Sequence, residues 1–367
     1  MDDLSVIRLD AEADWEAVRG RLLALEAAAD PDVYANWAFQ RAVWRAQADG
    51  RPAYLAVQED TSGWRGAAFF MAAKEKRGGL PVTVLRSLDF AVMKMAPSIA
   101  RRGEAAAFAE TLAAHRATLR RKTGASLVSL HKLAAPSAAP LVAALARQGV
   151  PHRVAPFNKS YQVALTDDFE AYWQTKARKS RYNIRRSARL LEEELGAPPS
   201  ILRARGERSE SKNFDDLWRR FKELRAQSWQ MQTAVETDPR YAERLESFFT
   251  DAMNDWGRRG WLDLSLLVCG ERVVAGQINA VTDGVQWVIL LAYDQSLARL
   301  SPGRVLMWMQ LEDGHARGDR AAVLGGASEE GKAFWANSIE TTLTVEWSLG
   351  GLSGASWALR QRLKRRP

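Results

Sequence analysis

The sequence predicts a mixed α/β protein with two lobes, each built on a mostly antiparallel mixed sheet flanked by helices. The chain has 367 residues, which is enough for roughly two domains with a core each. Apolar residues make up 47% and charged residues 26%, as in folded chains rather than disordered ones. Helical and strand patterns alternate, and the second half roughly repeats the order of elements in the first. Two diverged copies of one fold would produce this repetition.

The first half contains one α/β unit. Thr61-Ser62-Gly63 separates two apolar runs and predicts a β-hairpin, and Gly149, with Pro151 beyond it, ends the last helix. The predicted elements are a strand near 6–9, helices near 13–27 and 34–48, strands over 53–58 and 64–74, a β-rich run over 82–90, a helix over 104–121, a strand over 126–133 and a helix over 138–147.

The second half follows a connecting segment over 151–168, in which Thr166, Asp167 or Asp168 can cap a helical stretch that runs to Leu195. Two glycine-containing turns, at 270–271 and 283–284, separate three apolar runs and predict an antiparallel meander. The predicted elements are helices around 214–228, 241–258 and 304–318, and strands over 262–269, 273–281, 285–293, 321–325 and 341–347. We therefore expect lobes over 1–155 and 156–350 and a basic helical tail over 351–367.

Charge and cysteine content narrow the function classes. Lysine plus arginine exceeds aspartate plus glutamate by 52 − 44 = 8, which favours anionic partners such as phosphates, nucleotides, RNA or acidic lipid. The single cysteine, Cys269, excludes a disulfide framework and a thiolate metal cluster, and four scattered histidines offer no metal site. An acidic N-terminus and the absence of a long apolar run predict neither a secretory signal nor a membrane span. We expect a cytoplasmic protein that holds no metal.

The segment Ser301-Pro302-Gly303-Arg304-Val305 joins a predicted strand to a predicted helix. Free N–H groups and the dipole at a helix start attract an anion, and glycine lets a phosphate approach the backbone closely. The segment therefore suits a pyrophosphate. In the alternative interpretation Ser301 is an ordinary N-cap, Pro302 occupies the first helical position, and nothing binds.

A row of arginines follows one flank of the long predicted helix. Arg181, Arg185 and Arg189 recur every four residues beside an apolar face, where they can border a cleft and hold phosphates or carboxylates. Alternatively the row is a solvated face paired with the acidic residues at 192–194. No aromatic residues alternate with the arginines, so the row is a weak candidate for binding RNA.

Gly325-Gly326 follows a buried strand, and Lys332 and Trp335 come shortly after. The glycines permit close approach of a ligand, which the lysine and the tryptophan would cover. A glycine-rich turn with an ordinary surface lysine is the alternative.

Arg225 and Trp229 lie four residues apart and share one helical face. They either contact a substrate or form a core tryptophan with an arginine that extends to solvent.

Several catalytic templates are missing. The sequence has no G-x-S-x-G elbow, no Walker loop, no G-x-G-x-x-G after a strand and no H-E-x-x-H. Cys269 has no histidine near it in the sequence, so we expect it to be inert.

The order of these motifs resembles the GNAT-like acetyltransferases of the CelD/BcsL type, which are related to the FemAB fold and join two GNAT-like halves. The resemblance spans roughly 155–345, and the segments over 85–90 and 129–145 extend it into the first half. The matching residues are Phe169 to Trp173, Arg181 to Arg186, Tyr293-Asp294, Ser301 to Gly303, and Gly325-Gly326 with Lys332 and Trp335.

The resemblance implies that the strand ending at Tyr293 carries acyl-CoA and that the loop from Ser301 to Val305 holds its pyrophosphate. An amine or hydroxyl then attacks the thioester directly, and N–H groups of a splayed strand stabilise the oxyanion. The candidate bases are Asp294 and then Glu329, and Tyr293 is the candidate acid. The candidate substrate-binding residues are Arg181, Arg185, Arg225, Trp229, Lys332 and Trp335.

The sequence departs from the family pattern in two places. Glu329 and Glu330 are shifted relative to the acidic position of the family, and no tyrosine shortly precedes Lys332. The first half has no obvious phosphate loop, so we expect a degenerate lobe that shapes the cleft.

The expected function is acyl transfer, acetyl or another group, from acyl-CoA to an amine or hydroxyl of a sugar, a polysaccharide precursor (polysaccharide biosynthesis) or a small metabolite. One alternative is a FemAB-like transferase that uses aminoacyl-tRNA, which the net charge and the basic tail from Arg360 to Arg366 favour. The other is a non-catalytic module that binds an anionic polymer through the arginine row and shows a steep salt dependence.

Overall fold

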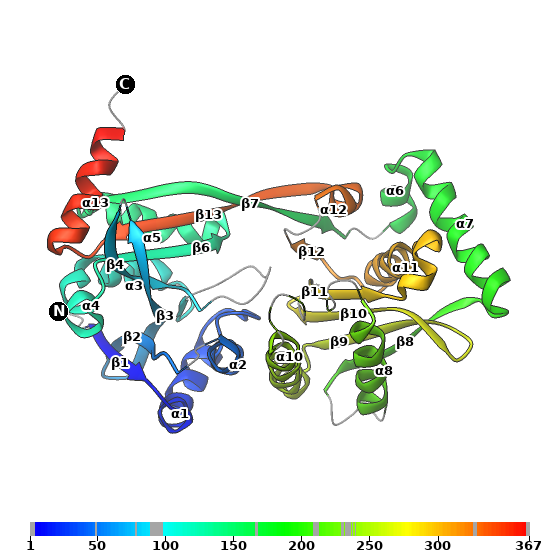
Figure 1. The fold of residues 1–367 in the computed structure, drawn as a ribbon, viewed down its shortest axis with the longest axis horizontal. Coiled ribbons are helices and arrows are strands. Elements are labelled where there is room, and N and C mark those ends of the chain that lie inside the picture. The colour runs from blue at the N-terminus through cyan, green and yellow to red at the C-terminus, as the bar shows by residue number, and fades with distance from the viewer. Residues whose placement is uncertain are drawn as a thin grey trace. The chain divides into compact units, whose positions relative to one another are not determined.

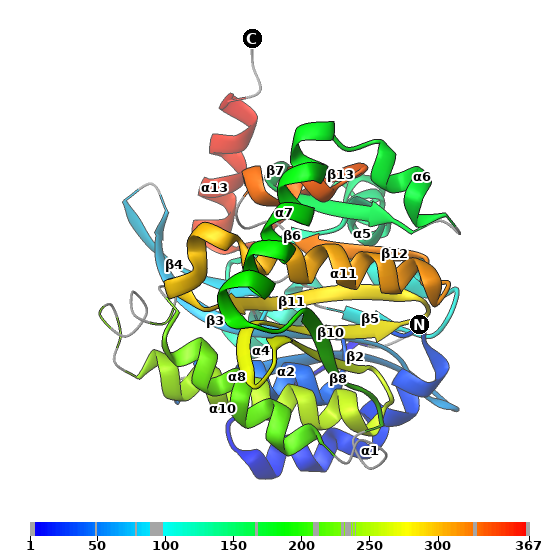
Figure 2. The ribbon, with the colours of Figure 1, turned by 90° about the vertical axis from the view of Figure 1, so that its right-hand side faces the viewer.

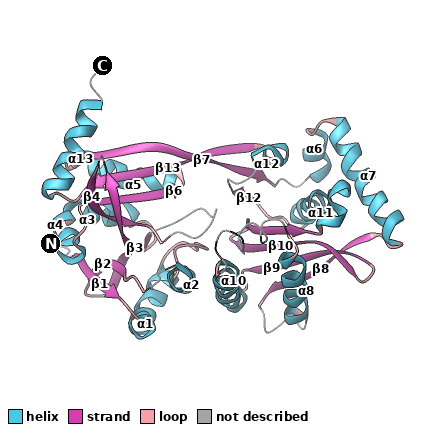
Figure 3. Cartoon of the chain, in the orientation of Figure 1, coloured by secondary structure: helices cyan, strands magenta, loops and turns pink. Residues whose placement is uncertain are grey.

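A computed structural model describes residues 4–47, 50–77, 79–88, 98–165, 168–207, 213–228, 231, 236, 238, 240–325 and 329–364 (Figure 1). The chain divides into two compact units, the first over 1–159 and 340–367 and the second over 160–339. The chain passes from one unit to the other within β7 (His152–Ala164) and returns within β13 (Ser338–Ser348). Both units contain helices and strands (Figure 3).

The first unit is a sheet with helices around it. Its strands follow the order β1-β2-β3-β4-β6-β13, with β5 paired to β3. The described pairs are antiparallel, except that β4 and β6 run parallel. The elements are β1 (Leu4–Leu9), α1 (Glu12–Ala28), α2 (Trp37–Gln47), β2 (Ala53–Asp60), β3 (Gly63–Arg77), β4 (Leu80–Arg86), β5 (Ser98–Ala100), α3 (Ala105–Ala114), α4 (Arg116–Thr123), β6 (Leu127–Leu133), α5 (Ala135–Arg147) and α13 (Gly351–Lys364).

The hairpin between β2 and β3 confirms the predicted turn. Asp60 Oδ1 accepts hydrogen bonds from the backbone N–H of Ser62 at 2.7 Å and from its Oγ at 2.6 Å. Gly63 has a φ of 111°, which disfavours a residue with a side chain. The local chemistry of the turn therefore sets the register that brings Ala56 opposite Ala68.

The second unit repeats this plan. Its strands follow the order β7-β12-β11-β10-β9-β8, and within the described pairs β11–β12 is the parallel one. The helix α11 packs on β10 and β11 (Figure 2). The elements are α6 (Phe169–Gln174), α7 (Arg178–Leu195), β8 (Pro199–Gly206), α8 (Phe214–Ala226), α10 (Tyr241–Arg258), β9 (Leu262–Cys269), β10 (Arg272–Thr282), β11 (Val285–Tyr293), the 3-10 helix η2 (Gln295–Leu300), α11 (Pro302–Ala316), β12 (Ala321–Gly325) and α12 (Glu329–Trp335).

The two units share one order of elements, which confirms the predicted mixed α/β fold with two similar lobes. In each unit a strand and two helices precede a three-strand antiparallel meander, and a crossover helix then leads to a parallel strand. The last strands are exchanged: β7 follows α5 in the chain and pairs with β12, while β13 follows α12 and pairs with β6.

Several predicted elements differ from the structure. The segment 151–168, predicted as a connection, contains the strand β7, and 199–206, which was not predicted to be a strand, forms β8. The predicted helix over 104–121 is interrupted at His115, and the stretch up to Leu195 forms two helices, α6 and α7. The two strands were missed because they carry charged residues, whose partners come from distant parts of the chain.

The C-terminal segment folds with the first unit instead of forming a separate tail. Trp357 and Ala358 of α13 are buried against Val82, Val84 and Leu127, which lie on β4 and β6. Trp357 is 7% exposed, so α13 adds to the core of that unit.

Candidate active site

The parallel strands β11 and β12 separate part of the way along their length. Their pairing runs from Val285 opposite Ala321 to Trp287 opposite Val323, and β11 then continues to Tyr293 paired with β10 but not with β12. At the same point the β10–β11 pairing shifts between Ile278 and Asn279, so that Ile289 forms a bulge. The outer edge of β11 beyond Trp287 is therefore not paired with β12 and offers backbone groups to an extended ligand.

The helix α11 begins where this free length of β11 ends. Ser301 has a left-handed backbone (φ 50°, ψ 49°), and no side chain caps the helix. The amides of Arg304 and Val305 bond the Ser301 carbonyl at 2.9 and 3.3 Å, and Pro302 has no N–H. The first turn thus presents the Gly303 amide, the positive end of a 15-residue helix and the exposed Arg304 guanidinium. This combination suits an anion.

Gly303 lies where α11 packs closely on β11. A Cβ at this position would lie 3.1 Å from Leu291 Cδ2 and 3.5 Å from Tyr293 Cδ1. The glycine lets the helix start close to the end of β11. A side chain here would point at the strand, so substitutions of Gly303 test packing as well as binding.

Lys332 lies at the other border of the separation, where β12 ends. Its Nζ would be 3.7 Å from a Cβ placed on Gly325. Within the described residues Lys332 makes no hydrogen bond or ion pair. Burial lowers the pKa of its ammonium group to about 8. The guanidinium of Arg304 stacks on the ring of Phe334 at 5.4 Å, which joins the start of α11 to α12.

Asp294 is held by its neighbours. Its Oδ1 accepts from the Ser296 N–H at 2.9 Å and from Ser296 Oγ at 2.6 Å, and its Oδ2 accepts from Arg272 Nη2 at 2.6 Å. Despite partial burial, which acts in the opposite direction, the hydrogen bonds from Ser296 and Arg272 lower the pKa of this carboxyl. Asp294 caps η2, and its lowered pKa makes it a weak proton acceptor at neutral pH.

The two other candidates for proton transfer differ in position. The half-buried Tyr293 ends β11, and its hydroxyl bonds no other described residue. Glu329 begins α12, and its side chain lies outside the described part of the chain.

Trp335 lies in the core of the second unit rather than over a substrate. It is 4% exposed, and its ring stacks on Trp173 at a centroid distance of 6.1 Å. Its carbonyl accepts from Tyr172 Oη at 2.7 Å and from Lys176 Nζ at 2.9 Å. These contacts hold α12 in place, and Lys332 with it.

Arg225 is also buried. It is 7% exposed, and its guanidinium lies 5.0 Å from the ring centre of Phe249, so it packs between α8 and α10. Trp229, which was predicted to share its face, lies outside the described residues. The predicted common face of Arg225 and Trp229 therefore stays a prediction, whereas the burial of Arg225 had no signal in the helical spacing.

The arginine row on α7 contacts α6. Arg181 donates to the side-chain carbonyl of Gln174, and Arg185 lies 3.8 Å from a carboxylate oxygen of Glu170. Arg185 is 52% exposed, and exposed ion pairs of this kind stabilise little. Arg181 and Arg185 therefore remain accessible to a competing anion, and their partners are not the acidic residues at 192–194.

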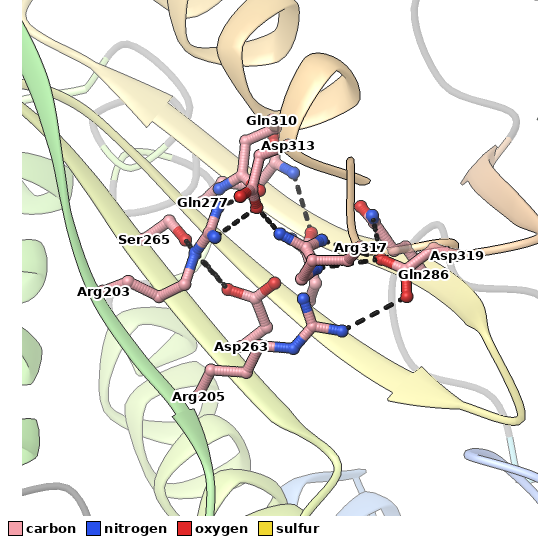
Figure 4. A network of polar contacts seen from close by, with 11 residues as sticks. Arg203, Arg205, Asp263, Ser265, Gln277, Gln286, Gln310, Asp313, Arg317 and Asp319 are labelled. Atoms are coloured by element: carbon pink, nitrogen blue, oxygen red, sulfur yellow. Dashed lines mark hydrogen bonds and ion pairs between the residues drawn. The ribbon is translucent and has the colours of Figure 1, made fainter. Parts of the chain in front are cut away.

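A partly buried network of charged and polar side chains fastens α11 to the sheet (Figure 4). Arg203 on β8 donates through Nε to Ser265 Oγ at 3.0 Å and through Nη2 to Gln310 Oε1 at 2.9 Å. Its Nε lies 3.3 Å from Asp263 Oδ1, and its Nη1 pairs with Asp313. Asp263 is fully buried, so its charge depends on these contacts.

The network continues beyond the C-terminal end of α11. Arg205 Nη2 lies 3.3 Å from Asp319 Oδ1, and Asp319 Oδ2 accepts from Gln286 Nε2 and Arg317 Nη2, each at 2.7 Å. With Arg203, Asp263 and Asp313, the network therefore holds three arginines and three aspartates. Sequence analysis missed it, although Arg203 and Arg205 recur at strand spacing, because no local pattern reveals partners about 110 residues away.

Two negative findings apply to the described part of the chain. It contains no group of three or more histidine, cysteine, aspartate or glutamate side chains that could hold a metal ion. None of its helices is both long and apolar enough to cross a bilayer.

Cys269 is buried, and burial raises the pKa of its thiol, as expected for an inert residue.

Comparison with known proteins supports the fold. Residues 178–333 match the sequence profile of the family described as acetyltransferase (GNAT) domain. A conserved protein of unknown function from Bacteroides thetaiotaomicron superposes with a TM-score of 0.57 at 12% identity, over 94% of this chain and 100% of that one. No curated protein matches the sequence.

Two further solved structures are similar over nearly their whole length. The C-terminal domain (DUF2156) of a putative lysylphosphatidylglycerol synthetase from Agrobacterium fabrum has a TM-score of 0.53 at 13% identity and covers 95% of each chain. FemX has a TM-score of 0.53 at 11% identity, over 92% of this chain and 96% of that one. At these identities the likeness shows a shared fold.

Proposed function

We propose that the chain, which carries a GNAT acetyltransferase domain over 178–333, is an acyltransferase that uses acyl-CoA. The observation that carries this proposal is the free edge of β11, which runs directly toward the uncapped start of α11. An extended pantetheine arm has amide groups that can bond the backbone of β11, and its pyrophosphate then reaches the Gly303 amide and Arg304. We therefore assign Ser301, Pro302, Gly303, Arg304 and Val305 to binding of the co-substrate.

Direct attack on the thioester fits these residues. The acceptor amine or hydroxyl attacks the thioester carbonyl, a tetrahedral oxyanion forms, and the thiolate then leaves. The bulge at Ile289 turns backbone groups of β11 out of the ladder, where an N–H can stabilise the oxyanion. The hydroxyl of Tyr293 is our candidate to protonate the thiolate, and Glu329 is a stronger candidate base than Asp294, whose pKa is lowered.

We propose that Lys332 binds the acceptor or the developing negative charge. It is a half-buried cation without a partner among the described residues, and it borders the separation of β11 and β12. An ammonium group in this position attracts a carboxylate, a phosphate or the oxyanion. Arg181 and Arg185, whose exposed contacts are easily replaced, are the proposed second anchor of an anionic acceptor.

The proposed acceptor is an amine or hydroxyl of a sugar, a polysaccharide precursor or a small metabolite, as in the CelD/BcsL type. An activity screen with acetyl-CoA as donor separates these acceptors. We propose a cytoplasmic location, which suits a soluble acyl-CoA supply.

A second candidate is transfer of an aminoacyl group from tRNA. The name lysylphosphatidylglycerol synthetase of one similar structure favours this reaction, since lysyl is an aminoacyl group. The net charge of +8 and the exposed Arg120, Arg121, Lys122 and Arg360 suit a polyanionic donor. Loss of activity after ribonuclease treatment would identify this donor.

A non-catalytic polymer-binding module would instead show salt-sensitive binding and no affinity for CoA.

Calorimetric titration with acetyl-CoA and desulfo-CoA tests the proposal. We expect binding by the native chain that Arg304→Gln weakens about tenfold, because one charge-assisted contact to the pyrophosphate is lost. The matched control is Arg258→Gln, which removes one exposed guanidinium at the end of α10 and leaves the affinity unchanged. A folded native chain that binds neither ligand would contradict the proposal and favour aminoacyl-tRNA.

A further inference from the structure

The first unit contains a cavity of about 280 Å³ that the proposed reaction does not use. It lies among the α1–α2 connection, β3, β5, α3, β6 and α5. Its wall is mostly apolar, with Phe70, Phe108, Leu112, Leu130 and Leu141 among the lining residues. The volume is about twice the roughly 150 Å³ of an engineered cavity that binds benzene.

Small residues keep this space open. Alanines at positions 35, 68, 100 and 109 line the cavity where larger apolar side chains would fill it. Gly66 on β3 makes room for one of the lining residues, Phe108. A Cβ at position 66 would lie 2.4 Å from ring carbons of Phe108. The glycine lets the Phe108 ring lie flat against the strand. Since protein interiors are normally close-packed, a void built in this way is suited to a ligand.

One carboxylate at the cavity has an unused oxygen. Asp32 Oδ1 accepts from the backbone N–H groups of Tyr34 at 2.7 Å and Ala35 at 3.0 Å, which fixes the orientation of the side chain. Within the described residues Asp32 Oδ2 accepts no hydrogen bond. Burial raises the pKa of this carboxyl, so its ionised form lacks the solvation that a surface aspartate has.

The other charges at the cavity are already neutralised. Arg101 pairs with Asp60, with 3.1 Å between Nη1 and Oδ2, and its Nε donates to the Trp64 carbonyl at 3.1 Å. Asp30 pairs with Arg102 at 2.8 Å on the surface. Asp32 is therefore the group that a ligand would complement, and a hydrogen-bond-donating cation does this best.

We propose that this cavity binds an amphiphilic amine, with an apolar body the size of a bicyclic ring among the alanines and a protonated amine paired with Asp32. An anion of the same shape is rejected, because its charge would face the carboxylate. The site is independent of acyl-CoA, so it stands whether or not the second unit transfers acyl groups.

Three probes with the same indole body test the charge preference. They are tryptamine, tryptophol and indole-3-propionate, titrated calorimetrically into the full-length chain without acetyl-CoA. We expect tryptamine to bind at least tenfold more tightly than indole-3-propionate, with tryptophol between them. The variant Asp32→Asn, which keeps the Oδ1 acceptor, should weaken tryptamine at least fivefold and leave tryptophol unchanged.

Cavity-filling variants test the location. Ala109→Leu and Ala68→Leu each place a larger side chain in the void and should abolish binding of all three probes. The control is Ala107→Leu, an exposed position on the same helix α3, which should bind as the native chain does. The two filling variants lie on different elements. If one of them fails to fold, the other still tests the location of the site, provided that it melts cooperatively. Failure of tryptamine to bind, equal binding of the cation and the anion, or binding retained after filling would each overturn the proposal.

Discussion

The crossover helix begins differently in the two units, although the order of elements around it is the same. In the second unit residues 294–301 join β11 to α11, and the helix starts with Ser301, Pro302 and the cationic Arg304. In the first unit residues 87–104 join β4 to α3, and Glu104 occupies the N-cap position. Glu104 pairs with Arg65 at 2.8 Å. A carboxylate at the positive end of a helix repels a phosphate, so the residues at the helix start, rather than the topology, decide which unit is suited to an anion.

The space beneath the two crossover helices differs as well. In the first unit Phe108, Ala109 and Leu112 of α3 border an apolar cavity. In the second unit Gln310 and Asp313 of α11 take part in a charged network. One fold thus supports a ligand-sized void in one copy and a rigid helix anchor in the other. This difference is what the following variants probe.

The largest effect is expected from breaking the polar network that fastens α11 to the sheet through Arg203 and Asp313. Asp263→Ala removes the fully buried carboxylate that neutralises Arg203 and should lower the free energy of unfolding by about 3–5 kcal/mol. Urea denaturation measures the change. The control Glu246→Ala breaks an exposed pair with Lys222 and should cost about 0–1 kcal/mol. Equal costs for the two variants would show that the network does not anchor α11.

A smaller effect is expected from Lys332→Met. Loss of a charge-assisted contact to the acceptor should lower kcat/KM about tenfold, whereas Lys222→Met, at a half-buried position on α8 that pairs with Glu246, should have no effect. An unchanged kcat/KM would remove Lys332 from the site.

The same variant has a stability readout. Burial lowers the pKa of Lys332 to about 8, whereas a lysine in the unfolded chain has a pKa of about 10.4. As the pH rises, the folded chain therefore loses this proton before the unfolded chain does. The stability of the native chain should therefore rise with pH between these values, through this group alone. Lys332→Met should be more stable than the native chain at pH 7, and the difference should fade as the pH rises. Urea denaturation at several pH values gives the comparison.

The smallest effect is expected at Ser301. A residue with a side chain at φ 50° is strained, so Ser301→Gly should raise the free energy of unfolding by up to about 1 kcal/mol. The affinity for acetyl-CoA should stay the same, because Ser301 belongs to the proposed binding segment through its backbone, whereas the contacts to the pyrophosphate are made by the Gly303 amide and Arg304. A loss of affinity would show that the Ser301 hydroxyl takes part in binding.

Local signals explain which elements could be predicted from the sequence. The meander of β9, β10 and β11 was predicted correctly because Gly270 and Gly284, both at positive φ, mark its turns. The helix α11 was predicted from Arg304 and begins two residues earlier, at Pro302, a residue that suits the first helical position. These residues act through their own backbone conformation, which neighbouring sequence specifies.

Long-range contacts explain what could not be predicted. The strand β8 was missed because its Arg203 is held by partners on β9 and α11, which no local pattern reveals. The position of Trp335 shortly after Gly325-Gly326 and Lys332 suggested that it covers a ligand, but its ring stacks on Trp173, a contact that the local sequence does not reveal. The cavity at Asp32 depends on alanines from several elements and has no sequence signature.

Hydrogen exchange of the chain, with and without saturating acetyl-CoA, tests most directly whether the anion site lies in the second unit and not in the first. We predict protection of backbone amides over 288–293 and 303–305, at β11 and the start of α11, and none over 105–109 at the start of α3. Protection of the α3 segment, or no protection over 303–305 when acetyl-CoA is bound, would contradict the assignment of the anion site to the second unit.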